Sequence, residues 1–416
     1  MAEKILNYET NGTLTIKNIV EKIQVRCTYQ DDENSNNKMN GIFHFDILPK
    51  EYSKLMGIHG KEFKYIGDNG VYIVGEITGN SYLFQINNRK LELYFKFDEI
   101  EKWIGYTENN THKLDIYFDV PYISLFDRGH EFGRGKAILE FVQPSLNLFC
   151  KPYKINIINS FKKENNYSNQ ILIDKTISFI IKTNLDLVPF RTKLVDIGKD
   201  FSEVLNCLSF LIHHKINWYS YNAYGYDAEN KLTETLFYKQ RKYNCGKELN
   251  IEENYEFKNL FKSKCISEII NGYLKLNKNE MLKLNRLINS FLTIKEMGYF
   301  ESKFITAFSV LEGICKLIKE KKKIKLNNNI KTNDFISSIL NKINVMHDFA
   351  AKNKNQNLRW IITDYRNDLM HFNTINEFDI PSLYDEYKKM MFLCRKLILW
   401  YINKKYINLP FPSKKF

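Results

Sequence analysis

The chain has 416 residues, too many for one ordinary hydrophobic core, so two or three domains are expected. Hydrophobic residues make up 44% of it, yet no stretch reaches the roughly 18 uninterrupted apolar residues of a membrane helix, and the start MAEKILNYET lacks the apolar run of a secretory signal. The net charge of +13 suits a polyanionic partner such as RNA, but a lysine- and asparagine-rich composition without functional meaning gives the same charge.

The first 192 residues have the pattern of a β-rich domain. Apolar residues alternate with polar ones at 91–98 and at 114–120, which is the period-2 signature of a half-buried strand. Turn-forming residues separate these stretches, as at Asp68-Asn69-Gly70. Many short strands at such spacing favour an antiparallel sandwich or barrel. Further strands are expected at 13–19, 41–47, 71–77, 137–142, 154–158 and 177–182.

Residues 193–416 change to a helical period and predict an all-α domain. Phe201, Val204, Leu205 and Leu208 recur at helical spacing within 200–214. The aromatic segment 218–226 is left open between a strand and an irregular loop. Further helices are predicted near 255–275, 280–297, 299–320, 332–349, 356–372 and 381–405. The fold class is therefore α+β and multidomain, with a β-rich domain at 1–192 and a helical bundle at 193–416.

The seven cysteines are odd in number and never form a CxxC pair, which argues against a disulfide framework and a zinc site. We therefore expect no metal and no cofactor, and a cytoplasmic protein with no membrane partner. His44, like most of the other histidines, has no partner that the sequence makes evident.

One helix combines residues suited to phosphodiester chemistry. In Tyr365-Arg366-Asn367-Asp368-Leu369-Met370-His371-Phe372, the apolar residues form a core-facing stripe, with Arg366 near its edge and His371 on nearly the opposite side. Trp360 and Met370 share that far side, which suggests a subunit interface. A surface helix with incidental Arg and His is the simpler interpretation of the spacing alone.

The segment Arg366 to His371 resembles the signature of HEPN ribonucleases, in which a polar residue follows an arginine and a histidine comes after a gap of four to six residues. The upstream segment with Phe304, Phe308 and Glu312 resembles the helix that precedes this signature in the family. The order of the two domains resembles that of ApeA-type anti-phage proteins, which place a β-rich domain before a HEPN domain. The resemblance covers roughly 200–405 by motif, and the first half only by general layout.

The resemblance implies a defence protein that limits phage growth by cleaving RNA, with a site composed across a homodimer or a higher homo-oligomer. It also implies a phage-derived trigger as a further partner. Transfer RNA is a reasonable substrate for an enzyme that blocks translation.

The chemistry can also be argued from the two side chains. Histidine is suited to moving a proton off the ribose 2′-hydroxyl or onto the 5′-oxygen at neutral pH. Arginine stays charged and offers a planar fork to phosphate oxygens in the transition state. Since one chain supplies one such histidine, two chains would supply both proton-transfer groups. The expected products are a 2′,3′-cyclic phosphate and a 5′-hydroxyl.

Supporting roles fall to residues near the motif. Asn367 is expected to orient His371 or the phosphate, Glu312 to brace Arg366, and Asp368 to support the site, although an exposed Asn and a structural ion pair give the same sequence. The segment after 315 is rich in lysine, and a solvated helix end is its ordinary explanation. The residues predicted to contact RNA are Lys321, Lys322, Lys323 and Lys325.

Two other functions remain open. The HEPN-like half could be a non-catalytic scaffold whose β-domain binds a protein or a polysaccharide. A partner of a small nucleotidyltransferase is disfavoured, because such toxins carry a tyrosine two positions after the histidine, where this chain has Asn373.

Overall fold

The computed structural model of the chain describes most of the two predicted domains. It forms two compact units: Met1–Ser202 with Ile216–Glu253, and Glu203–Lys215 with Asn254–Phe416. None of the described helices is long and apolar enough to cross a membrane. The described residues are 6–31, 39–45, 55, 58–85, 88–106, 110–121, 146–150, 153–165, 171–185, 188–213, 215–240, 263–326, 331–345, 349–354, 357–372 and 380–405.

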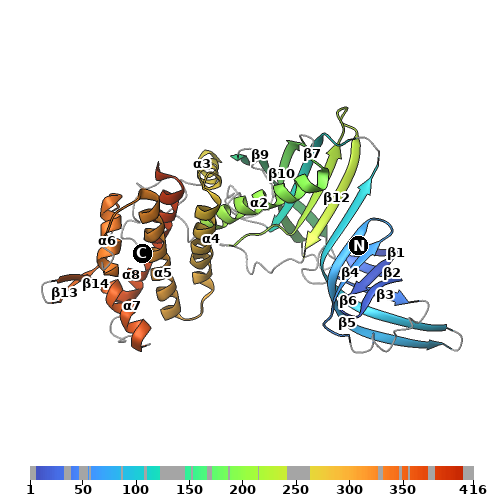
Figure 1. Ribbon diagram of the computed structural model, residues 1–416, viewed down its shortest axis with the longest axis horizontal. Coiled ribbons are helices and arrows are strands. Elements are labelled where there is room, and N and C mark those ends of the chain that lie inside the picture. Colours follow the sequence, from blue (N-terminus) through green and yellow to red (C-terminus); the bar gives the residue numbers. More distant parts are fainter. Residues whose placement is uncertain are drawn as a thin grey trace, which may run out of the picture. The chain divides into compact units, whose positions relative to one another are not determined.

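The first six strands close into a barrel. Each pairs with its neighbours in antiparallel fashion in the order β3-β2-β1-β4-β5-β6, and β6 pairs back with β3 (Figure 1). Because the ring is closed, no strand within it leaves a long unpaired edge. The strands are β1 (Leu6–Ile16), β2 (Val20–Asp31), β3 (Met39–Phe45), β4 (Glu62–Gly67), β5 (Val71–Gln85) and β6 (Asn88–Gly105).

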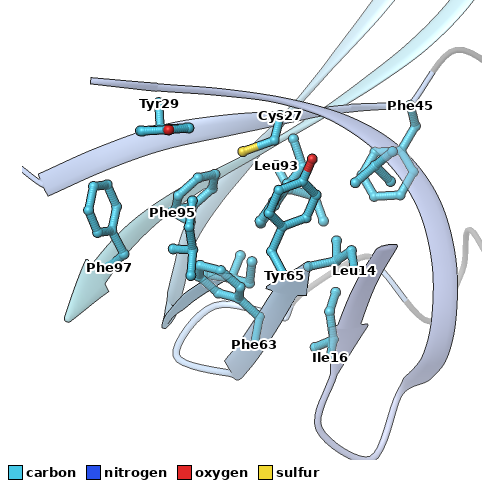
Figure 2. Packing of buried hydrophobic residues seen from close by; sticks show 14 of the residues in the cluster. Leu14, Ile16, Cys27, Tyr29, Phe45, Phe63, Tyr65, Leu93, Phe95 and Phe97 are labelled. Atoms are coloured by element: carbon cyan, nitrogen blue, oxygen red, sulfur yellow. The ribbon is translucent and has the colours of Figure 1, made fainter. Parts of the chain in front are cut away.

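Aromatic side chains fill the inside of this barrel, as Figure 2 shows for Phe63, Tyr65 and Phe95. Alternation produces this core: β4 alternates exposed and buried residues along its whole length. Phe43 stacks on Phe95 with ring centres 4.2 Å apart and meets Phe63 edge-on at 5.0 Å. Each buried ring contributes about 1.5–3 kcal/mol of apolar burial. The Tyr65 hydroxyl donates to the Thr10 carbonyl at 2.8 Å, so its burial leaves no unsatisfied donor.

The last residues of β6 pair with β12, so this strand also begins a second set of strands. This set follows the order β6-β12-β11-β7-β10-β9-β8, again antiparallel. The helix α2 (Phe190–Ile212) packs its first half here, because Phe201 stacks on Phe118 at 4.3 Å. The strands are β7 (Lys113–Pro121), β8 (Leu146–Cys150), β9 (Tyr153–Asn165), β10 (Ile171–Asn184), β11 (Ser220–Tyr226) and β12 (Leu232–Gln240).

The β-rich unit therefore extends past residue 192. The hairpin of β11 and β12 follows α2 in sequence but inserts between β6 and β7, where Ser220 pairs with Asp119 and Leu236 with Trp103. Its backbone groups complete two strand edges that would otherwise stay unpaired. The aromatic segment at 218–226 thus contains a strand. The strand expected at 137–142 lies outside the described residues.

The second unit is built around one central helix, α5. Nine of its residues are buried, and it contacts α4, α6, α7 and α8. Phe300 meets Tyr387 near the start of α5 and α8, and Lys321 meets Tyr401 near their ends, so these two helices run in the same direction. The elements are α3 (Ser263–Leu274), α4 (Lys278–Thr293), η3 (Ile294–Glu296), α5 (Phe300–Lys322), α6 (Thr332–Lys342), β13 (Ala351–Lys354), β14 (Asn357–Trp360), α7 (Ile361–Phe372) and α8 (Ile380–Ile402).

The coarse prediction of a β-rich amino-terminal half and a helical carboxy-terminal half is confirmed. Several helix boundaries differ from the predictions, and the helix expected at 200–214 already begins at Phe190. The helix expected at 332–349 ends at Lys342, where Asn344 follows with a positive φ of 54°. The helix expected at 356–372 begins only at Ile361, because the residues before it form the β13–β14 hairpin.

Candidate active site

The candidate motif lies on α7, a short helix anchored at its start and along its length. Ile362, Tyr365 and Leu369 are buried at helical spacing, and Tyr365 meets the Phe304 ring of α5 edge-on at 6.3 Å. Thr363 donates to Asn333 of α6 at 3.4 Å. These contacts fix α7 against two neighbouring helices, so the residues on its remaining faces have a defined position.

The entry to α7 is held by a buried carboxylate. Glu386 of α8 is only 3% exposed, and it accepts from the Ala350 backbone N–H at 3.1 Å. Ala350 in turn accepts from the Ile361 backbone N–H at 2.9 Å. Lys389 lies 2.7 Å from Glu386 and compensates its charge. The start of α7 is therefore linked to Glu386 of α8 by two successive hydrogen bonds, both made by the backbone of Ala350.

Arg366 lies half-buried between α7 and α5, and two side-chain contacts to described residues hold it. Its Nη1 donates to Asn367 Oδ1 at 3.1 Å. Its guanidinium carbon lies 5.9 Å from the centre of the Phe308 ring, within the range of a cation–π contact. Neither partner carries a negative charge, so the guanidinium keeps its full charge to offer to an anion.

The side chain of Asn367 contacts Arg366 in this structure. It is half-buried and accepts a hydrogen bond from the guanidinium, whereas the sequence predicted that it orients His371 or a phosphate. Asp368 is exposed on α7. Asn367 therefore holds the Arg366 side chain, and Asp368 lies on the solvent side.

His371 is the last residue but one of α7, and its side chain lies outside the described part of the structure. The five positions between Arg366 and His371 correspond to about 140° of rotation and about 7.5 Å of rise along an α-helix. Their backbone positions therefore fall on different sides of α7. A reaction that needs both groups at one phosphate is easier to build from two copies of this helix than from one.

Glu312 of α5 is engaged by a neighbour on its own helix. Its carboxylate lies 2.7 Å from Lys316 Nζ, an i,i+4 pair whose lysine is 62% exposed. Among the described contacts it is this lysine, and not Arg366, that pairs with Glu312. An exposed pair of this kind is worth about 0.3–0.5 kcal/mol.

The predicted RNA-binding lysines lie at the far end of α5. Lys321 and Lys323 follow Phe308, the ring beneath Arg366, by about 20 Å along the helix axis. Lys323 ends the helix in the left-handed conformation, and Lys323 and Lys325 are both exposed. Within one chain the lysines and Arg366 therefore do not share a surface at close range.

Two of these lysines have structural contacts. Lys321 donates to the Tyr401 carbonyl at 2.9 Å and lies 4.1 Å from the centre of the Tyr401 ring, and burial lowers its pKa. Lys322 lies over the Trp400 ring at 5.6 Å, and the nearby Lys404 lowers its pKa. Because the parallel helices α5 and α8 end side by side, lysines here complement both sets of terminal carbonyls.

Of the two residues predicted to form an interface face on α7, Trp360 and Met370, only Met370 is exposed. Trp360 belongs to β14 and is 7% exposed, with its ring 5.2 Å from that of Phe349. Met370 is 53% exposed. The prediction that Trp360 and Met370 share an exposed helical face is wrong, because Trp360 precedes the helix and packs inside its own chain.

The first unit holds a cavity of about 820 Å³ near the start of α2. Its lining is mixed, with apolar Val188 and Phe190 beside polar His112, Lys113 and Glu234. Glu234 is held by Thr111 Oγ1 at 2.5 Å and by the indole N–H of Trp103 at 3.0 Å. No sequence motif marks this cavity, because its walls come from three separate turns.

Among the described residues, no group of three or more His, Cys, Asp or Glu side chains is arranged to hold a metal ion. No family model matches the chain, and neither a curated protein nor a solved structure matches it.

A second group of reactive side chains was missed by the sequence analysis. Thr28, His44 and Glu92 meet on the outer face of the barrel, although they are far apart in the chain. In the sequence, these three residues differ from their neighbours only in being polar residues between two apolar ones, which predicts that they face outward from the barrel.

Proposed function

We propose that the protein is a metal-independent endoribonuclease of an anti-phage defence system, with a HEPN-type site made of Arg366 and His371 from two chains. The observation that carries the proposal is the state of Arg366. It is half-buried and fixed by Asn367 and Phe308, yet no described carboxylate neutralises it. A fixed and uncompensated guanidinium on the same short helix as a histidine suits binding of a scissile phosphate.

The reaction needs two proton transfers and one site of charge stabilisation. One imidazole takes the proton of the 2′-hydroxyl, whose oxygen attacks the adjacent phosphorus. A second imidazole gives a proton to the departing 5′-oxygen. Arg366 stabilises the negative charge that builds on the non-bridging oxygens. The products are a 2′,3′-cyclic phosphate and a 5′-hydroxyl, and no metal takes part.

The second copy of His371 comes from a partner chain in this proposal. Exposed Met370 lies next to His371 in sequence and gives the partner helix an apolar contact. The β-rich unit would then sense infection or hold the nuclease inactive. Transfer RNA is the substrate we propose for a defence enzyme that stops translation.

The test is cleavage of RNA by the purified chain in EDTA, with the products' ends identified. Arg366→Ala and His371→Ala should each abolish cutting. Arg286→Ala and His59→Ala are matched controls, because both side chains are exposed and belong to neither motif. Retained cleavage in both motif variants would exclude this site.

A second function is a non-catalytic scaffold whose β-rich unit binds a polysaccharide or a protein. The cavity lined by His112, Lys113 and Glu234 favours it, since about 820 Å³ is within the range of small-ligand sites. Tyr106, which is 52% exposed, would offer an aromatic face to a sugar ring. Glycan binding that is lost in Glu234→Ala, in a chain that cuts no RNA, would support this function instead.

A further inference from the structure

Three outward-facing residues of the barrel form a row across strands β2, β3 and β6. Alternation sets their direction, because the residues on either side of each one are buried in the core. His44 lies directly opposite Glu92 in the pairing of β3 with β6, and Thr28 lies diagonal to His44 in the pairing of β2 with β3. The inward neighbours are Cys27, Tyr29, Phe43, Phe45, Leu91 and Leu93.

The contacts in this row form a hydroxyl–imidazole–carboxylate relay. Thr28 Oγ1 lies 2.9 Å from His44 Nε2, and His44 Nδ1 lies 3.3 Å from Glu92 Oε1. The tautomer with its proton on Nδ1 accepts the Thr28 hydroxyl proton at Nε2 and turns its N–H side toward Glu92. This is the order of groups that activates a hydroxyl as a nucleophile: the base touches the hydroxyl, and the acid orients the base.

Glu92 is itself held in place. Its other oxygen accepts from Ser81 Oγ at 3.3 Å and from the Tyr94 hydroxyl at 3.2 Å. The side chains of His44 and Glu92 are 18% and 19% exposed, so both groups are largely shielded from solvent but still reach the surface. The acid is therefore oriented from both sides, as a positioning residue requires.

A cationic side chain lies beside the relay. Arg26 is directly opposite His44 in the strand pairing and two residues from Thr28. Its Nη1 lies 3.1 Å from Glu9, while its Nε is buried and has no hydrogen-bond partner within the described part of the chain. Arg26 thus places a guanidinium next to the relay in the strand register, with Glu9 as its ionic partner.

We propose that Thr28, His44 and Glu92 form a second active site, which hydrolyses small activated carboxylic esters and is independent of Arg366 and His371. His44 Nε2 takes the Thr28 proton as Oγ1 attacks the ester carbonyl. The leaving alcohol departs with that proton, and an acyl group remains on Thr28. Water then gives a proton to His44 and attacks the acyl carbonyl, which releases the acid and returns the proton to Thr28.

The test uses the full chain and p-nitrophenyl acetate. We expect p-nitrophenolate release and a peptide acetylated at Thr28 after an acid quench. Thr28→Ala should remove both signals, Thr28→Ser should keep them, and His44→Ala should lower the rate by about 100-fold. Thr13→Ala and His59→Ala are the matched controls: Thr13 is an outward-facing strand threonine, and His59 is an exposed histidine outside the relay.

Glu92 needs a readout that a purely structural role would not change. Glu92→Gln should lower the rate of acetylation, because the carboxylate that faces Nδ1 and orients the imidazole is lost, and Glu92→Asp should restore part of the rate. No acetylation at Thr28 in the wild-type chain would overturn the proposal. So would acetylation that is unchanged in His44→Ala. The first of these two outcomes is measured in the wild-type chain, so it does not depend on how any variant folds.

Discussion

The guanidinium of Arg366 lies over the ring of Phe308, with 5.9 Å between its central carbon and the ring centre. The contact links α7, which carries the candidate motif, to α5 at the centre of the helical unit. The quadrupole of the ring attracts the cation without neutralising it, as a carboxylate would. This relationship explains how an arginine can be fixed in place and still be free to bind an anion.

Replacing Arg366 by lysine tests whether the planar fork matters. Lysine keeps the charge but loses the two-pronged geometry and the contact with Asn367. We expect RNA cleavage to fall by at least about 100-fold, while the free energy of unfolding changes by less than about 1 kcal/mol. Single-turnover cleavage and urea unfolding measure the two effects. Cleavage at the wild-type rate would show that charge alone is enough.

Asn367 and Asp368 are adjacent on α7 but should behave differently. Asn367→Ala removes the acceptor of the Arg366 Nη1 hydrogen bond, so we expect about a 10-fold loss of cleavage, equivalent to about 1.4 kcal/mol. Asp368 is exposed, and Asp368→Ala should change the rate by less than about 2-fold. Equal losses in the two variants would contradict the positioning role given to Asn367.

The lysines at the end of α5 should divide into two groups. Lys321→Ala removes the hydrogen bond to the Tyr401 carbonyl, so we expect it to lower the free energy of unfolding by about 1 kcal/mol. Lys323 and Lys325 are exposed, and their joint replacement by alanine should leave stability unchanged. If they contact RNA, the slope of log affinity against log salt falls by about 1 to 2. A slope that does not change would remove these two lysines from the RNA-binding surface.

Tyr387 provides a test of packing at the start of α8. Burial raises the pKa of Tyr387 to about 12, whereas the unfolded chain ionises it near 10. Between those two pH values the unfolded state loses the proton first, so stability falls as pH rises. Tyr387→Phe should lose less stability than the wild type between pH 10 and 12 and equal it near pH 8. Parallel stability curves in urea over the whole range would indicate that Tyr387 is solvated.

The sequence predicted the strands of the barrel well where alternation was strong, as for Leu91, Leu93 and Phe95 in β6. It could not predict that β11 and β12 insert between β6 and β7, because alternation says which side chains are buried and not which edges pair. Leu358 and Ile361 fit a helical stripe by spacing, although Leu358 lies in β14. Four residues are too few for periodicity to separate the two structures.

The candidate site was predictable as a motif but not as a set of contacts. Arg366 and His371 are predicted as a pair from the resemblance of their segment to the HEPN signature, and both belong to α7. The Glu312–Lys316 pair is an i,i+4 pair that spacing could have predicted, but Glu312 was assigned to Arg366. The partners of His44 depend on how β2, β3 and β6 are paired and in which register, and this pairing could not be predicted from one sequence.

The most direct measurement for the central claim is RNA cleavage in EDTA by two inactive variants, first apart and then mixed. We predict that Arg366→Ala and His371→Ala are each inactive, while Arg286→Ala and His59→Ala cut RNA at the wild-type rate. Mixing the two inactive chains should not restore activity, because a mixed pair holds one copy of His371 and the proposed reaction uses two imidazoles. Full activity in either motif variant alone would contradict the claim that these residues act together on the phosphate.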